Sequence, residues 1–238
     1  MSGLARADRP LILLDLDNTI LDFDMAERTA LSRAFTVMGV AYDDALLKLY
    51  NRINIRHWQM LEDGLLTREE VLVKRFEALY REAGIQADAA QTGVLYERFL
   101  AEGHWFMPGA EALLEALFGP YRLFLCSNGS AAVQDGRIAS AGIAPYFEKI
   151  FVSEHMGANK PEKAYFDLCF AQIPDFCRER TIMLGDSLTS DIRGGINAGV
   201  LTCWYNPRKQ ENPGAIHPDF EISALEDFPP LLEELFGE

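Results

Sequence analysis

The sequence predicts an α/β fold, a doubly wound and mostly parallel sheet into which an all-helical domain is inserted. Three observations support this prediction. The four consecutive apolar residues Leu11–Leu14 are typical of a strand buried on both faces of a parallel sheet. The stretch from Met25 to residue 103 then shows only helical periodicity. From Pro108 onward, strand-like and helical segments alternate, which indicates repeated βαβ units.

The strands expected after Leu11–Leu14 are short apolar segments, and helical segments separate them. The strands are 122–126, 150–153, 181–184 and 201–205, with residues 220–223 as a candidate for one more. The helices are 109–118, 130–141, 161–172 and 189–198, followed by a closing helix at 225–236. Gly142 and Gly199 stand where two helices should end, because glycine readily adopts the left-handed conformation of a C-cap.

The insertion is expected at residues 21–107, which leaves residues 1–20 and 108–238 for the α/β core. Apolar residues recur at helical spacing over 43–62, 67–83 and 88–102. Thr67 and Glu70 have the spacing of a capping box at the start of the second of these helices. The insertion therefore reads as helices alone.

The charge balance argues against a nucleic-acid polymer as partner. The chain has 22 Lys and Arg residues against 36 Asp and Glu residues, a formal net charge of −14. A surface that neutralises a phosphate backbone needs clustered basic residues, and no basic run is longer than the two residues of Arg208-Lys209. With 49% hydrophobic and 24% charged residues, the composition is that of an ordinary globular protein. The charge balance does not exclude small charged ligands.

Membrane and secreted locations are not expected. The longest uncharged stretch, 194–207, has 14 residues and contains Asn, Gly and Pro, whereas a spanning helix needs about 20 apolar residues. Asp15 and Asp17 interrupt the apolar run near the N-terminus, which argues against a signal peptide. The four cysteines show no CxxC spacing. We expect a reduced, cytoplasmic protein without a zinc site.

Polar residues follow several of the expected strands. Asp15 and Asp17 close the first strand, Ser127-Asn128 closes the second, and Asp186 closes a later one, while Lys160 precedes a helix. In a doubly wound sheet, ligands bind beyond the carboxyl ends of the strands. Carboxylates and an ammonium group gathered there would be costly to bury without a ligand.

This residue set suits phosphoryl transfer through an aspartyl-phosphate. Asp15 is the candidate nucleophile, since a carboxylate can attack phosphorus and leave an acyl phosphate that water cleaves. Asp17 is the candidate acid and base, which protonates the departing alkoxide and then deprotonates the water. The neighbouring carboxylates predict Mg²⁺, with ligands from Asp15, Asp186 and the Asp17 main-chain carbonyl.

The remaining candidates would bind the phosphate group. Ser127, Asn128 and Lys160 are expected to hold its equatorial oxygens, where charge builds in the transition state. Asp191 lies five residues beyond Asp186. Two interpretations of Asp191 stay open. In the first, its side chain orients Lys160 or a metal-bound water. In the second, it only places a favourable negative charge at a helix N-terminus.

These segments resemble, in order, the four motifs of the haloacid dehalogenase superfamily, and the resemblance covers nearly the whole chain. The motif residues are Asp15-Leu-Asp17-Asn-Thr, Ser127-Asn128-Gly, Lys160-Pro and Gly185-Asp186-Ser-Leu-Thr-Ser-Asp191. The resemblance implies a Rossmann-like core and identifies the insertion as the family's helical cap, with Leu21-Asp-Phe-Asp24 similar to the flap that leads into it. One departure is Asn18, where the first motif most often has Gly.

A narrower resemblance suggests a substrate. Segments 153–162 and 194–207 look similar to the pyrimidine 5'-nucleotidases that hydrolyse ordinary and modified nucleoside monophosphates. This implies a substrate such as UMP, dUMP or dTMP, with its base under the cap. His57-Trp58 and His104-Trp105-Phe106 could form an aromatic slot for the base, although helical packing explains them almost as well.

Other functions share parts of this pattern. A phosphatase or mutase acting on small sugar phosphates or phosphoglycolate would use the same motifs. A 2-haloacid dehalogenase also uses an Asp nucleophile, but it needs no metal and no acid such as Asp17. A non-catalytic phosphate-binding module would not require the reactive carboxylate that is present here. The sequence leaves the oligomeric state open.

Overall fold

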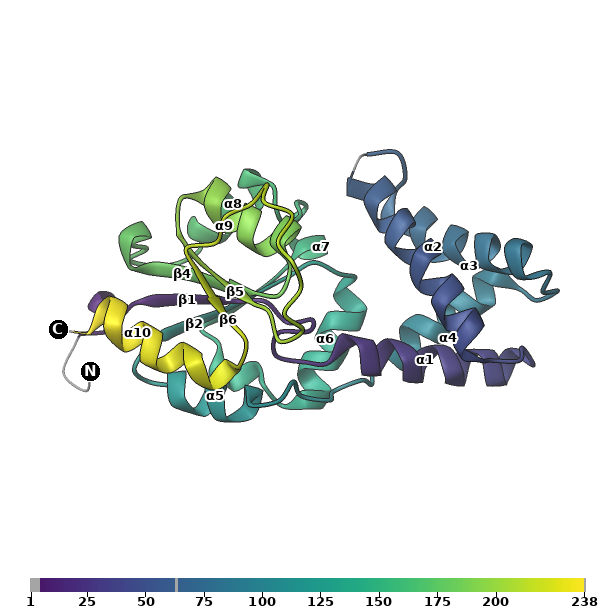
Figure 1. Ribbon diagram of the computed structural model, residues 1–238, viewed down its shortest axis with the longest axis horizontal. Coiled ribbons are helices and arrows are strands. Elements are labelled where there is room, and N and C mark those ends of the chain that lie inside the picture. Colours follow the sequence, from purple (N-terminus) through teal and green to yellow (C-terminus); the bar gives the residue numbers. More distant parts are fainter. Residues whose placement is uncertain (1–4, 63, 238) are drawn as a thin grey trace. The chain divides into compact units, whose positions relative to one another are not determined.

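The computed structural model describes residues 5–62 and 64–237, which form two compact units. The first unit contains the described residues up to Phe23 and those from His104 onward, and the second is Asp24–Gly103. Figure 1 shows a sheet with helices in the first unit and helices alone in the second. That 21–107 folds as a domain of its own stays a prediction.

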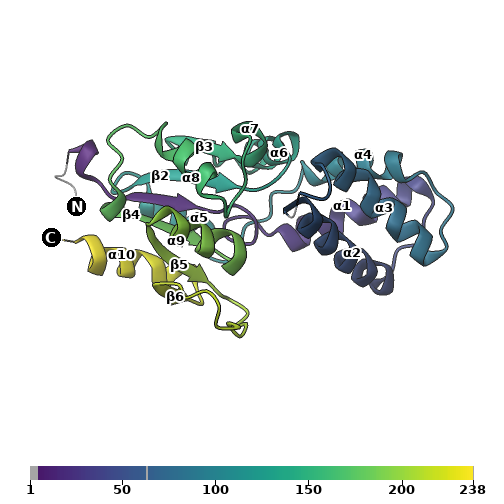
Figure 2. The same ribbon diagram turned by 90° about the horizontal axis from the view of Figure 1, so that it is seen from above.

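The first unit contains one six-stranded parallel sheet in the order β3-β2-β1-β4-β5-β6 (Figure 2). Its strands are β1 (Leu11–Leu14), β2 (Arg122–Ser127), β3 (Lys149–Val152), β4 (Thr181–Gly185), β5 (Leu201–Tyr205) and β6 (Phe220–Ile222). The order reverses beside β1, as expected for a doubly wound sheet. The predicted fold class is confirmed, including the candidate sixth strand.

Strand β1 is apolar throughout because helices cover both faces of the sheet. Ile12 and Leu14 belong to a cluster that includes residues of α5 (Ala110–Leu117), α6 (Ala131–Ala141) and α10 (Phe228–Phe236). Leu11 and Leu13 belong to the cluster on the opposite face, with residues of α8 (Lys163–Phe170) and α9 (Arg193–Ala198). The alternation of side chains along a strand thus supplies both cores from one short run.

Several expected elements have different bounds or helix types in the structure. The segment predicted as a helix over 189–198 begins with a π-helical turn, Leu188–Ile192, before α9. Its backbone is held by side chains, because Ser187 Oγ accepts a bond from the Ser190 amide and Asp191 accepts one from the Ser187 amide. The strand predicted over 150–153 ends at Val152, since a short helix, α7 (Ser153–Met156), begins at the next residue.

The described residues of the second unit form four helices, α1 (Phe23–Met38), α2 (Asp44–Glu62), α3 (Arg68–Ala83) and α4 (Ala89–Leu100). The capping box at Thr67 and Glu70 is present, and Gly84 ends α3 with a φ of 67°. Phe76 packs against Tyr50 and Tyr96, with ring centroids 5.4 and 5.6 Å apart. None of the helices within the described residues is both long enough and apolar enough to span a bilayer.

An ion pair between the buried Arg122 and the partly exposed Glu148 fastens β2 to the segment before β3. Arg122 is 2% exposed and donates from Nε and Nη2 to the Glu148 carboxylate, which also accepts a bond from Arg6. Burial raises the pKa of Glu148, but hydrogen bonds from Arg122 and Arg6 outweigh it and hold the pKa below its usual 4.5. This pair therefore stabilises the fold above pH 4.5, and the contribution is lost as the pH falls through the lower folded-state pKa.

We predict that Glu148→Gln lowers the free energy of unfolding at pH 7 by about 1.5–3 kcal/mol, because Arg122 loses its charged acceptor. The difference from the parent should shrink below pH 4.5. Urea unfolding at pH 7 and at successively lower pH measures both effects. Asp167→Asn is the control, since its pair with Lys163 lies on an exposed helix surface and should be worth less than about 0.5 kcal/mol. Equal stability of parent and Glu148→Gln at pH 7 would contradict the prediction.

Candidate active site

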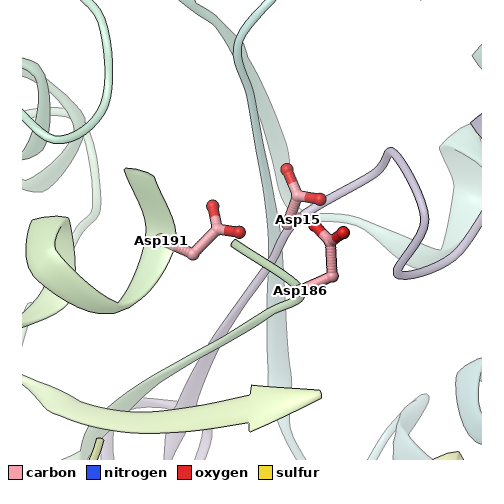
Figure 3. A group of neighbouring side chains, drawn as sticks. All are labelled: Asp15, Asp186 and Asp191. Carbon is pink, nitrogen blue, oxygen red and sulfur yellow. The ribbon is translucent and has the colours of Figure 1, made fainter. Parts of the chain in front are cut away.

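Three carboxylates meet at the carboxyl ends of the two central strands. Asp15 follows β1 and Asp186 follows β4, and these strands are paired with Leu14 opposite Leu184. One oxygen from each of Asp15, Asp186 and Asp191 lies within 4.8 Å of the others. Figure 3 shows Asp15 and Asp186 side by side, with the Asp191 carboxylate directed toward them. The site thus combines residues that are up to 176 positions apart (191 − 15).

Lys160 ties this cluster together. Its Nζ donates to Asp15 Oδ1 at 2.6 Å, to Asp191 Oδ1 at 2.7 Å and to the Cys126 carbonyl at 2.6 Å. The side chain is 1% exposed, and these three acceptors use all three N–H groups of the ammonium. Lys160 therefore has a fixed position beside Asp15.

The cluster carries more negative than positive charge. Burial raises the pKa of Asp15 to about 7, and the Asp191 carboxylate adds to the rise while Lys160 opposes it. Burial, followed by the charges of Asp15 and Asp191, raises the pKa of Asp186 well above its usual value. The pKa of Lys160 is raised because the two carboxylates outweigh the effect of its burial. A divalent cation would offset this excess, and carboxylate oxygens are suitable ligands for Mg²⁺.

Asn128 and Ser127 lie at the end of β2. The Asn128 amide forms two bonds with the Lys160 main chain, donating to its carbonyl at 2.8 Å and accepting from its N–H at 2.9 Å. Asn128 thereby fixes the segment that carries Lys160, and one N–H of its Nδ2 remains for a ligand. Ser127 Oγ accepts a bond from Gln134 Nε2 at 2.7 Å. Phosphate binding by these residues stays a prediction.

Asp17 does not join the carboxylate cluster. Its side chain faces α6, where Arg137 donates to Oδ1 and Gln134 donates to Oδ2 at 2.7 Å. Sequence reasoning missed both partners. The signal in the sequence is a glutamine and an arginine one helical turn apart on α6, and it becomes informative only once the helix is known to bury that face.

Hydrogen bonds and close packing hold the backbone around the site. Asn18 has a φ of 58°, a left-handed conformation that asparagine tolerates better than most residues. Its Oδ1 accepts a bond from the Phe23 N–H at 3.0 Å, which explains how it can replace the glycine usual in the motif. A Cβ at Gly185 would lie 2.3 Å from the Asp191 carboxyl group. Trp204, which lies in the segment 194–207, donates to the Asp186 carbonyl at 2.8 Å.

The aromatic residues proposed for a base slot lie in both units. His57 Nδ1 lies 2.8 Å from the Ile53 carbonyl within α2, and the Arg68 guanidinium lies 5.6 Å from the Trp58 ring centroid. In the first unit, His104 and Trp105 are stacked, and His104 Nδ1 lies 2.7 Å from Ser140 Oγ. Local packing accounts for these contacts, and the slot stays a prediction.

Comparison with known proteins identifies the family. The family model of the haloacid dehalogenase-like hydrolases, which describes their common sequence pattern, matches residues 10–199 of this chain. The chain belongs to this family. It is therefore a hydrolase, and the family resemblance predicted from the motifs is confirmed.

Three relatives match over almost the whole chain. The HAD-hydrolase YfnB of Bacillus subtilis is 42% identical over 216 residues, covering 91% of this chain and 92% of YfnB. A crystal structure of YfnB bound to magnesium matches with a TM-score of 0.89 at 41% identity, covering 94% and 98% of the two chains. The pyrimidine 5'-nucleotidases PynA of Streptococcus pneumoniae and YjjG of Escherichia coli are 37% and 34% identical, covering 94% and 93% of this chain and 94% and 96% of their own lengths.

We predict that Mg²⁺ stabilises the folded protein by binding at the carboxylate cluster. At ten times the dissociation constant, binding contributes about 1.4 kcal/mol, which corresponds to a rise in Tm of about 3–6 °C for a chain of this size. Asp186→Asn should reduce the rise to less than about 1 °C, because it removes one charged ligand. Thermal unfolding with MgCl₂ or EDTA measures the effect. Asp167→Asn is the control and should keep the parent's response. An unchanged response in Asp186→Asn would place the metal elsewhere.

Proposed function

We propose that this hydrolase cleaves phosphoric monoesters of small molecules through an aspartyl-phosphate on Asp15. The observation that carries the proposal is the position of Asp15, held by Lys160 next to Asp186 and Asp191 at the carboxyl edge of the sheet. Such a site offers a nucleophile, a fixed positive charge for phosphate oxygens and a set of oxygen ligands for a cation.

In the first step, an oxygen of the Asp15 carboxylate forms a bond to phosphorus. The ester P–O bond breaks, and its electron pair stays on the leaving oxygen, which takes a proton from Asp17. Asp15 is well fixed for this attack, since Oδ1 accepts from Lys160 and Oδ2 accepts from Thr19 Oγ1 at 3.2 Å. The alcohol then leaves.

In the second step, Asp17 takes a proton from a water molecule that attacks the same phosphorus. The bond between phosphorus and Asp15 breaks, which restores the carboxylate and releases inorganic phosphate. The positive charge of Lys160 would attract the phosphate oxygens through both steps, and the Ser127 hydroxyl would donate a hydrogen bond to one of them. Asp191 keeps Lys160 in place and so acts through it.

Mg²⁺ is the proposed metal, and the residues present fit it. Asp15, Asp186 and the Asp17 main-chain carbonyl would hold the ion. When bound, Mg²⁺ would offset the negative charge of the cluster and allow a phosphate dianion to approach. The magnesium in the YfnB structure supports this choice.

For the substrate, we propose a pyrimidine nucleoside 5'-monophosphate. Support comes from PynA and YjjG, both named as pyrimidine 5'-nucleotidases and both similar over more than nine-tenths of this chain. We also propose a cytoplasmic location, where nucleotides occur and where the four cysteines, all free thiols in the structure, would stay reduced. Cell fractionation tests the location.

Asp15→Asn should lower kcat at least about a thousandfold, because a neutral amide cannot replace the attacking carboxylate. Phosphate release under saturating substrate measures the change. Tm and the circular dichroism spectrum check the fold, and Asp167→Asn should retain the parent's rate. Turnover above one-tenth of the parent's would remove Asp15 as nucleophile.

A substrate panel tests the proposed specificity. We expect Mg²⁺-dependent phosphate release from UMP, dUMP or dTMP, and little from AMP, 2-phosphoglycolate or hexose phosphates. EDTA should abolish the release. A higher kcat/KM for a sugar phosphate or phosphoglycolate than for these nucleotides would contradict the nucleotidase proposal. It would leave the proposed phosphatase mechanism unchanged. Chloride release from 2-chloropropionate, without phosphate release from any ester, would overturn the phosphatase proposal itself.

A further inference from the structure

We infer that Arg137 and Gln134 are positioning residues that hold the Asp17 carboxylate where it can protonate the leaving oxygen. This inference rests on the proposed function, in which Asp17 is the acid and base. Both residues lie on α6, outside the segments that supply Asp15, Lys160 and Asp186. Each contacts a different oxygen of Asp17.

Arg137 is the stronger partner. Its side chain is 0% exposed, and an arginine so deeply buried requires a compensating negative charge. The Asp17 carboxylate, itself 24% exposed, supplies that charge. The guanidinium also lies 5.4 Å from the centroid of the Phe23 ring, within the distance of a cation–π contact. Arg137 is thus fixed between an aromatic ring and Asp17.

Gln134 connects Asp17 to the proposed phosphate site. Its Nε2 donates to Asp17 Oδ2 and to Ser127 Oγ, both at 2.7 Å, and its side chain is 2% exposed. The two N–H groups of one amide therefore set the spacing between the acid and a hydroxyl that would hold the phosphate. A Cβ at Gly129 would lie 3.0 Å from Gln134 Nε2, so the glycine leaves room for this amide.

These contacts restrict Asp17 without blocking its chemistry. An unrestrained aspartate can occupy three staggered χ1 rotamers, whereas bonds to both oxygens select one. Each carboxyl oxygen has two lone pairs, so a proton can occupy the position that Arg137 or Gln134 does not use. As the ester P–O bond breaks, that proton passes to the leaving oxygen, and the charge left on Asp17 faces Arg137.

The test compares two leaving groups. An alkyl phosphate needs the acid because its alkoxide leaves poorly, whereas the nitrophenolate of p-nitrophenyl phosphate leaves without a proton. In Arg137→Met and in Gln134→Met, kcat/KM for the alkyl phosphate that the parent hydrolyses fastest should fall about 30-fold or more, since kcat/KM reports the steps up to departure of the leaving group. The kcat/KM for p-nitrophenyl phosphate should fall less than about threefold, because the later step in which Asp17 acts as base does not enter kcat/KM. Arg137→Lys, which keeps the charge, should recover much of the lost rate on the alkyl ester.

Arg122→Met is the matched control, since Arg122 is also a buried arginine in an ion pair but stands at the opposite end of β2 from Ser127. It should leave the ratio of the two rates unchanged. Asp17→Asn should show the same selective loss as Arg137→Met. Adding Arg137→Met to Asp17→Asn should lower kcat/KM for the alkyl phosphate by less than about a further twofold, because both substitutions remove the same function.

Equal losses on both substrates, or no loss on either, would overturn the positioning role. If Asp17→Asn lowers both kcat/KM values equally, the acid role of Asp17 in the proposed function fails. If Asp17→Asn is selective and neither α6 variant is, only the present inference fails. Should Arg137→Met not fold, as judged by circular dichroism, Gln134→Met alone decides the outcome.

Discussion

The ammonium group of Lys160 is the interaction on which the site depends. It donates to Asp15, to Asp191 and to the Cys126 carbonyl, and so joins β1, β2 and the turn that follows β4. Without this charge, two buried carboxylates would face each other with nothing to offset their repulsion. Asn128 in turn fixes the Lys160 backbone through two hydrogen bonds. The proposed nucleophile Asp15, its counter-charge Lys160 and the loop that carries Lys160 are therefore parts of one network.

The sheet makes this network possible. Strand β1 lies between β2 and β4, so residues that follow these three strands emerge at the same edge. In doubly wound sheets, ligands bind beside such a reversal of strand order. Asp17, two residues beyond Asp15, is directed to α6 instead of the carboxylate cluster. The two acids therefore have different surroundings, which suits the different roles proposed for them.

Much of the fold could be predicted because it depends on local patterns. Leu11–Leu14 predicted a fully buried strand, and the capping box at Thr67 predicted the start of α3. The π-helical turn at Leu188–Ile192 could not be predicted, because it depends on hydrogen bonds from the backbone to side chains. The periodicity of hydrophobic residues does not show such bonds. The contacts of Gln134 and Arg137 with Asp17 also escaped prediction. A glutamine and an arginine on a helix usually face solvent, and only the packing of α6 buries them.

The sequence by itself determined the family, since its motifs place a carboxylate after a buried strand, a lysine and further carboxylates in a fixed order. It also determined the alternation of strands and helices, because the periodicity of apolar residues is a local property of the sequence. Only the tertiary structure decided which charges meet. The pairing of Asp17 with Arg137 joins residues 120 positions apart, and the pairing of Asp15 with Lys160 joins residues 145 apart. Such contacts depend on strand order and helix packing, which no local pattern specifies.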